Sequence, residues 1–216
     1  MLDKNVIINR LAFIKYLYRV AVEQSQKSEP LCAASVLFFH DAVELFLQLT
    51  SEHLDIGKEG LKFMEYWDLI SKKLDIELSQ KESMRRLNRA RVSLKHHGTL
   101  PSKLDIEAFR ASSTAFFKEN TPIIFGVDFS QISLIELIQY EGVKNKLKNA
   151  EKLAKENKIE EALDKVALAF TELIDNYEDK IIEQYGKNPF LFGKSMTFMS
   201  SFFMGLRRAE SSKVER

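Results

Sequence analysis

The chain has 216 residues, of which 45% are hydrophobic and 29% are charged, and its formal net charge is +1. That hydrophobic content is ample for a folded core and excludes a chain that is disordered throughout. The small net charge argues against a protein that simply coats nucleic acid along its whole surface.

The sequence also limits the cellular setting. Cys32 is the only cysteine, so neither an intrachain disulfide nor a cysteine-based zinc site is possible. The N-terminus lacks a basic segment followed by a long apolar run, and no stretch reaches the roughly 18 uninterrupted apolar residues of a membrane span. We therefore expect a soluble, cytoplasmic protein with no membrane contact.

Apolar residues recur at helical spacing along most of the chain, and nowhere do they alternate over a length that predicts a strand. Ile7, Leu11 and Ile14 begin the first such stripe. The helix that follows Pro30 is apolar on nearly every side, which is typical of the central helix of a bundle. The fold class is therefore all-α. Helices are expected over 5–27, 31–54, 59–74, 80–97, 103–120, 131–157 and 159–185.

The fourth expected helix, 80–97, is strongly basic. A capping box that starts at Ser79 predicts its beginning, and Gly98 predicts its end. Residues 81–103 include seven Lys and Arg and one acidic residue, which is a local net charge of +6. Such a patch is typical of a surface that binds phosphates, although a solvated helix face has the same composition.

The second half of the chain is expected to extend the bundle. We expect the fifth helix to end before Pro122, and 123–129 to be an ordered connector packed on the bundle. The last two helices, separated near Asn157, predict an antiparallel hairpin, because a tetratricopeptide-type solenoid needs about three such units. The predicted domains are thus 1–122, a helical bundle, and 123–216, a helical extension packed on it.

A Phe- and Met-rich segment, 190–204, follows the last expected helix. It is hydrophobic enough to be a final helix docked on the bundle, an oligomer contact, or an edge that meets another domain or a protein partner. Burial within the same protein is the interpretation we favour.

Within the basic helix, Arg91 and His96 have the spacing Arg-x4-His near the helix end. This spacing resembles the signature of the HEPN family, small all-helical domains that include metal-independent RNases. The second helix carries Asp41 and Glu44 in an apolar run, which looks like the family's early core helix with its buried acidic residue. The resemblance covers residues 5–120.

The resemblance implies a HEPN-like bundle and an endoribonuclease, of the kind found as toxins or effectors in bacterial toxin–antitoxin and antiviral defence systems. An arginine stabilises charge on a phosphate, and a histidine that titrates near neutrality moves the proton of a ribose hydroxyl. The expected catalytic residues are Arg91, His96 and His97, with Arg89, Asp41 and Glu44 in support and with Arg85, Arg86 and Lys95 contacting RNA.

The register of the motif is ambiguous, and we rank Arg91 with His96 first, Arg91 with His97 second and Arg89 with His96 third. At roughly 100° per residue, Arg91 and His96 lie about 140° apart on the helix. One helix cannot aim both at one phosphate, so activity is expected to need a homodimer with this helix at its twofold axis. Glu44 or Asp41 is expected to pair with an arginine of the same helix.

Two other functions stay open. Val92 stands where the family commonly has a polar residue, which favours a non-catalytic module that binds RNA, nucleotide or protein through the basic helix. The third possibility is a helical adaptor that acts through 131–206. His40, Asp41 and Glu44 are potential metal ligands, but no inward-facing Glu-x-x-His pair accompanies them, so the sequence predicts no metal and no cofactor. His40 is expected to be a hydrogen-bonded core histidine.

Overall fold

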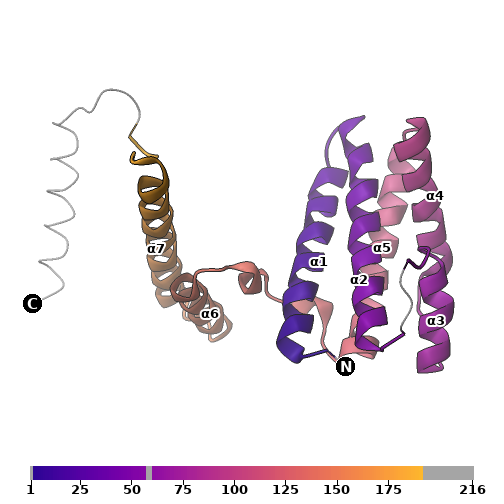
Figure 1. Ribbon diagram of the computed structural model, residues 1–216, viewed down its shortest axis with the longest axis horizontal. Coiled ribbons are helices and arrows are strands. Elements are labelled where there is room, and N and C mark those ends of the chain that lie inside the picture. The colour runs from indigo at the N-terminus through magenta and orange to yellow at the C-terminus, as the bar shows by residue number, and fades with distance from the viewer. Residues whose placement is uncertain (1, 57–59, 192–216) are drawn as a thin grey trace, which may run out of the picture. The chain divides into compact units, whose positions relative to one another are not determined.

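The computed structural model describes residues 2–56 and 60–191, and this part of the chain is helical and contains no strand (Figure 1). The prediction of an all-α fold is confirmed. The α-helices are α1 (Lys4–Ser25), α2 (Ser35–His53), α3 (Glu65–Leu74), α4 (Lys81–His97), α5 (Lys103–Phe125), α6 (Glu141–Lys155) and α7 (Ile159–Tyr185). Three short 3₁₀ turns join them: η1 (Leu31–Ala34), η2 (Phe129–Gln131) and η3 (Leu134–Leu137).

The chain divides into two compact units, 1–139 and 140–216. The boundary therefore falls later than the predicted division at residue 122. Phe129 and Ile132 belong to the core of the first unit, where both side chains are buried. The predicted packing of a C-terminal extension on the bundle stays a prediction.

Helix α2 is the centre of the first unit, and it contacts α1, α3, α4 and α5 (Figure 1). Its side chains are apolar on most sides, so it can be buried by neighbours on every face. Phe46 shows the result, since its ring meets Phe116, Phe117 and Phe125 of α5 edge-on at centroid distances of 5.2–5.6 Å. Edge-to-face aromatic pairs of this kind add to the stability gained by burial.

The segment Leu31–His53 has the length and mean hydropathy, 1.4, of a membrane span. In this structure 56% of that window is buried against the rest of the protein. A core helix of a bundle and a membrane helix share this composition, and here the neighbouring helices account for the apolar side chains.

Helix α5 continues through Pro122 to Phe125, so the predicted end before Pro122 is wrong. A proline removes one backbone hydrogen bond inside a helix, but near the end of a helix this loss affects only the last turn. Ile124 is buried and Phe125 packs on Phe46, and these contacts favour the extra turn. The helix ends at Gly126, whose φ of 67° suits a residue without a side chain.

Helix α6 begins at Glu141, ten residues later than predicted. The preceding chain forms η2 and η3 instead, because two side chains capture local backbone N–H groups. Asp128 accepts from the N–H of Ser130 and Ser133 accepts from the N–H of Ile135. Such local hydrogen bonds compete with a continuous helix. The third helix also begins later than predicted, at Glu65, after the turn closed by Lys62 and Glu65.

In the second unit, α6 and α7 pack against each other. The buried positions are mostly small side chains, Ala150, Ala162 and Ala169, which allow a close approach of the two helices. The break predicted near Asn157 is present, and Asn157 itself has a φ of 62°. Most of the Phe- and Met-rich segment 190–204 lies outside the described residues.

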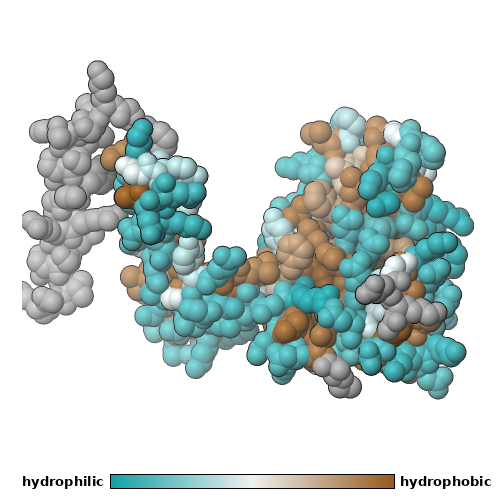
Figure 2. Space-filling model, viewed as in Figure 1, coloured by the Kyte–Doolittle hydropathy of each residue, from teal (hydrophilic) through white to brown (hydrophobic). Residues whose placement is uncertain are grey.

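Hydrophobic side chains also reach the surface of the first unit, over α1 and α2 in the view of Figure 2. Val6 and Phe13 of α1 are both more than 40% exposed, and Phe13 stacks on Tyr16 with ring centroids 6.3 Å apart. The exposed apolar residues of α1 and the basic residues of α4 therefore belong to two separate surfaces.

Candidate nucleic-acid interface

The basic helix α4 matches its predicted range within one residue, but its N-terminus is built differently from the prediction. The expected capping box does not form, because the N-cap is Gln80, with a φ of 63°, and no side chain caps it. Ser79 is held instead by Asn120 of α5, whose Oδ1 accepts from the Ser79 N–H at 3.1 Å and whose Nδ2 donates to the Ser79 Oγ at 3.0 Å. A buried amide from another helix thus sets the start of α4.

The C-terminus of α4 follows the prediction. Gly98 has a φ of 66° and donates to the carbonyl of Leu94 at 3.1 Å, and Thr99 donates to the carbonyl of Ser93 at 3.3 Å. The bond from Gly98 to Leu94 is that of the αL cap, and the two bonds satisfy carbonyls near the end of the helix. The last turn carries Lys95, His96 and His97, and cations are favoured there by the helix dipole.

Helix α4 presents its basic residues on more than one face. Met84 and Leu87 are buried, and Arg91 lies half-buried on the same stripe. The structure thus places Arg91 and His96 on different faces, as the helical wheel predicts, and no hydrogen bond or ion pair joins the two within the described chain. The side chains that face solvent are Arg86, Arg89, Lys95, His96 and His97.

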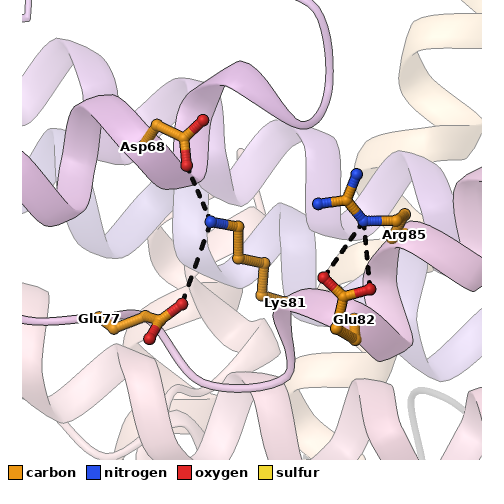
Figure 3. A network of polar contacts seen from close by, with 5 residues as sticks. All are labelled: Asp68, Glu77, Lys81, Glu82 and Arg85. Atoms are coloured by element: carbon orange, nitrogen blue, oxygen red, sulfur yellow. Dashed lines mark hydrogen bonds and ion pairs between the residues drawn. The ribbon is translucent and has the colours of Figure 1, made fainter.

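The first turns of α4 are neutralised by acidic neighbours (Figure 3). Lys81 donates to Asp68 at 2.8 Å and lies 4.0 Å from Glu77, while Arg85 lies 3.2 Å from the Glu82 carboxylate. Surface ion pairs contribute little stability, but they cancel positive potential locally. The positive face of α4 is therefore centred on the residues after Arg85.

A pocket of about 520 Å³ lies beside this face, between α4 and the start of α5. The turn at Gly98 sends the chain back along α4, which brings the first turn of α5 next to Arg86 and Arg89. Sequence reasoning missed this pocket, because no motif marks it and its walls come from the turn geometry. It is lined by Arg86, Arg89, Ala90, Ser93, Thr99, Leu100, Pro101, Ser102, Asp105 and Phe109.

The acidic residues of α2 do not make the expected ion pair with Arg89 or Arg91 among the described residues. Asp41 and Glu44 lie against His40 of their own helix, with carboxylate oxygens 3.6 Å and 3.8 Å from its Nδ1. Their side chains are 54% and 33% exposed, so water solvates them without an arginine. The expectation that Glu44 is the buried acidic residue of this helix is therefore wrong.

His40 is a core residue, as predicted, since its side chain is 2% exposed and its Nε2 lies 3.0 Å from the Oδ1 of Asn88 on α4. Its hydrogen bonding is only half satisfied, because the buried Nδ1 has no hydrogen-bond partner among the described residues. Burial lowers the pKa of His40, the carboxylate of Glu44 opposes that shift, and the positive charge of Arg91 adds to it. Of the predicted supporting residues, Asp41 and Glu44 lie against His40, and the predicted catalytic Arg91 acts on the same ring through its charge.

Comparisons with models of known protein families, with curated proteins and with solved structures give no match for this chain.

Proposed function

We propose that this protein binds RNA through α4 and that a homodimer of it cleaves RNA without a metal, in the manner of a HEPN-type endoribonuclease. In the same proposal the first unit is a HEPN-like bundle and α6 with α7 is an antiparallel hairpin that extends it. A toxin or effector role in a bacterial defence or toxin–antitoxin system follows from the resemblance alone.

One observation carries the proposal. Arg86, Arg89 and Lys95 of α4 face solvent and have no ion-pair partner within the described chain, and His96 and His97 follow at the end of the same helix. Cations without internal partners are available to phosphates, and they release counterions when RNA binds. An exposed histidine next to them supplies a side chain of the kind that acts as a general acid or base.

The chemistry requires two chains, because Arg91 and His96 lie on different faces of one helix. In a dimer with α4 at the twofold axis, His96 of one chain accepts the proton of a ribose 2′-hydroxyl. The 2′-oxygen then bonds to the adjacent phosphorus, and the bond from phosphorus to the 5′-oxygen breaks as that oxygen takes up a proton. Arg91 of the other chain stabilises the charge that develops on the phosphoryl oxygens.

Mixing two inactive variants tests this arrangement. Arg91→Ala and His96→Ala homodimers should each lose cleavage. When their subunits are exchanged, a mixed dimer has one site with Arg91 and His96 both intact, because each comes from a different chain. We expect cleavage to return on mixing, to at most half of the wild-type rate per dimer. If subunit exchange occurs and cleavage does not return, the two residues do not form a site between chains.

The pocket beside α4 favours one second candidate. Arg86, Arg89 and Ser93 line it within a single chain, so a phosphate-bearing ligand could bind there without dimerisation or cleavage. Val92, which is exposed and apolar, fits this non-catalytic alternative. Salt-sensitive RNA or nucleotide binding by a chain that leaves RNA intact would support this candidate over the RNase.

A further inference from the structure

His40 is held in one orientation and one tautomer. Its ring stacks on Phe63 with a centroid distance of 4.4 Å, and its Nε2 faces the carbonyl oxygen of Asn88. A carbonyl oxygen only accepts hydrogen bonds, so Nε2 carries the hydrogen of the neutral ring. The lone pair of the neutral ring is therefore on Nδ1.

That lone pair is directed at two further acceptors. The Nδ1 atom is buried and has no hydrogen-bond partner in the described structure. The Oδ1 of Asp41 and the Oε2 of Glu44 lie 3.6 Å and 3.8 Å from it, which is longer than a normal hydrogen bond. The three ligand atoms all lie within 4.8 Å of one another. Three electron-pair donors that face each other without a bridging atom are unfavourable.

We propose that His40, Asp41 and Glu44 bind one first-row divalent cation of the Zn²⁺ class. Metal bonds to imidazole nitrogen and carboxylate oxygen are about 2.0–2.2 Å long, so neighbouring ligand atoms of a tetrahedral site are roughly 3.4 Å apart. The distances of 3.6 Å and 3.8 Å exceed this value by only a few tenths of an ångström. Two carboxylates also balance the charge of one divalent cation.

The surroundings of His40 suit this role. Metal-binding histidines usually donate their other ring N–H to a carbonyl or carboxylate, and Asn88 accepts that hydrogen bond here. Asp41 and Glu44 are partly exposed, which leaves room for water as a further ligand.

The sequence-based expectation of no metal rested on the lack of Glu-x-x-His pairs on two helices. The proposed site differs from that type, because its three ligands come from one helix and a neighbouring helix contributes only Asn88. It is also separate from the proposed cleavage, since no step of that reaction uses the cation.

Titration of the tag-free, full-length chain with Co²⁺, after removal of metals with a chelator, tests the proposal. We expect one Co²⁺ per chain, with absorption bands typical of nitrogen and oxygen ligands, and displacement by Zn²⁺. Trp67, the only tryptophan, provides a second readout, because its ring lies 5.5 Å from that of Phe63, which stacks on His40. Bound Co²⁺ should quench its fluorescence.

The variants Asp41→Asn and Glu44→Gln keep the size of each side chain, sit at partly exposed positions and should leave the fold intact. Each should weaken Co²⁺ binding at least tenfold. His53→Gln is the matched control, since His53 lies on the same helix and also has a buried Nδ1 without a partner. It should bind Co²⁺ like the wild type.

Three results would overturn the proposal. One is the absence of stoichiometric Co²⁺ binding by the folded wild-type chain. That result would mean that Nδ1 binds a proton and not a metal ion. The second is binding that persists in both Asp41→Asn and Glu44→Gln. The third is binding that is lost only when His96 and His97 are replaced, which would place the metal on the surface of α4.

Discussion

Asn88 of α4 accepts a hydrogen bond from the Nε2 of His40, in the second turn of α2, across 3.0 Å. This contact joins the buried helix of the bundle to the basic helix one turn before Arg91. It also connects α4 to the proposed metal site, because His40 is one of the proposed ligands.

The variant Asn88→Leu tests this contact. Leucine has the same number and branching of side-chain heavy atoms as asparagine but accepts no hydrogen bond, so both nitrogens of the buried His40 ring would lack a hydrogen-bond partner. Leaving a buried polar group unsatisfied costs about 1–3 kcal/mol, and we expect the free energy of unfolding to fall by that amount. Urea unfolding followed by circular dichroism measures it. Arg86→Ala, an exposed change on the same helix, should alter stability by less than about 0.5 kcal/mol.

The variant Asn120→Leu should also destabilise the protein, by about 1–3 kcal/mol, because it removes the anchor of Ser79. Asn120 is fully buried and makes three hydrogen bonds, two of them to Ser79 and one to the carbonyl of Phe116. Thr121→Val is the control, since Thr121 is equally buried but bonds only within its own helix. If both variants lower the unfolding free energy equally, the anchor between the helices has no special role.

These two contacts show where sequence reasoning succeeds and where it fails. The residue types at its two ends predict α4 within one residue, and the helical spacing of its apolar residues places Arg91 toward the core, because both depend on residues in or next to the helix. It cannot predict that Ser79 bonds to Asn120, because 41 residues separate them and a local capping box was available. The same limit affects Glu44, since periodicity indicates which face a residue is on but not which side chain it meets.

Replacing Lys81 with Met should raise the pKa of Asp68. The hydrogen bond from Lys81 lowers the pKa of Asp68 below 3.8, and the charge of Lys81 adds to that effect. A carboxyl group whose pKa is lowered in the folded protein stabilises the fold at pH values above its ordinary pKa. This contribution is lost as the pH falls through the lowered pKa. Carboxyl titration by NMR measures the shift. Arg85→Met should change the pKa of Asp68 less, because Arg85 makes only a small electrostatic contribution. An unchanged pKa in Lys81→Met would mean that the pair does not persist in solution.

RNA binding should depend steeply on salt, and removing the cations of α4 should reduce that dependence. Each phosphate contact contributes about 0.7 to the slope of log K against log salt for single strands. We expect Arg86→Ala, Arg89→Ala and Lys95→Ala each to weaken binding and lower the slope by about this amount, as measured by fluorescence anisotropy. Arg10→Ala is the control, since Arg10 on α1 already pairs with Glu52. Equal losses in the control and the α4 variants would indicate non-specific attraction rather than a surface on α4.

Cleavage should continue in EDTA and should leave a 2′,3′-cyclic phosphate, because the proposed reaction uses the 2′-hydroxyl and no metal. His96→Ala should lower the rate by a factor of about 10²–10⁴, the usual contribution of a general acid–base group. The melting temperature should not change, since His96 is exposed.

His97→Ala should lower the rate less than His96→Ala if His96 pairs with Arg91. A larger loss in His97→Ala would assign the catalytic histidine to position 97. Product analysis by mass spectrometry separates this chemistry from metal-dependent hydrolysis, which leaves no cyclic phosphate. A rate that falls to background in EDTA, with the fold intact, would contradict the metal-independent mechanism.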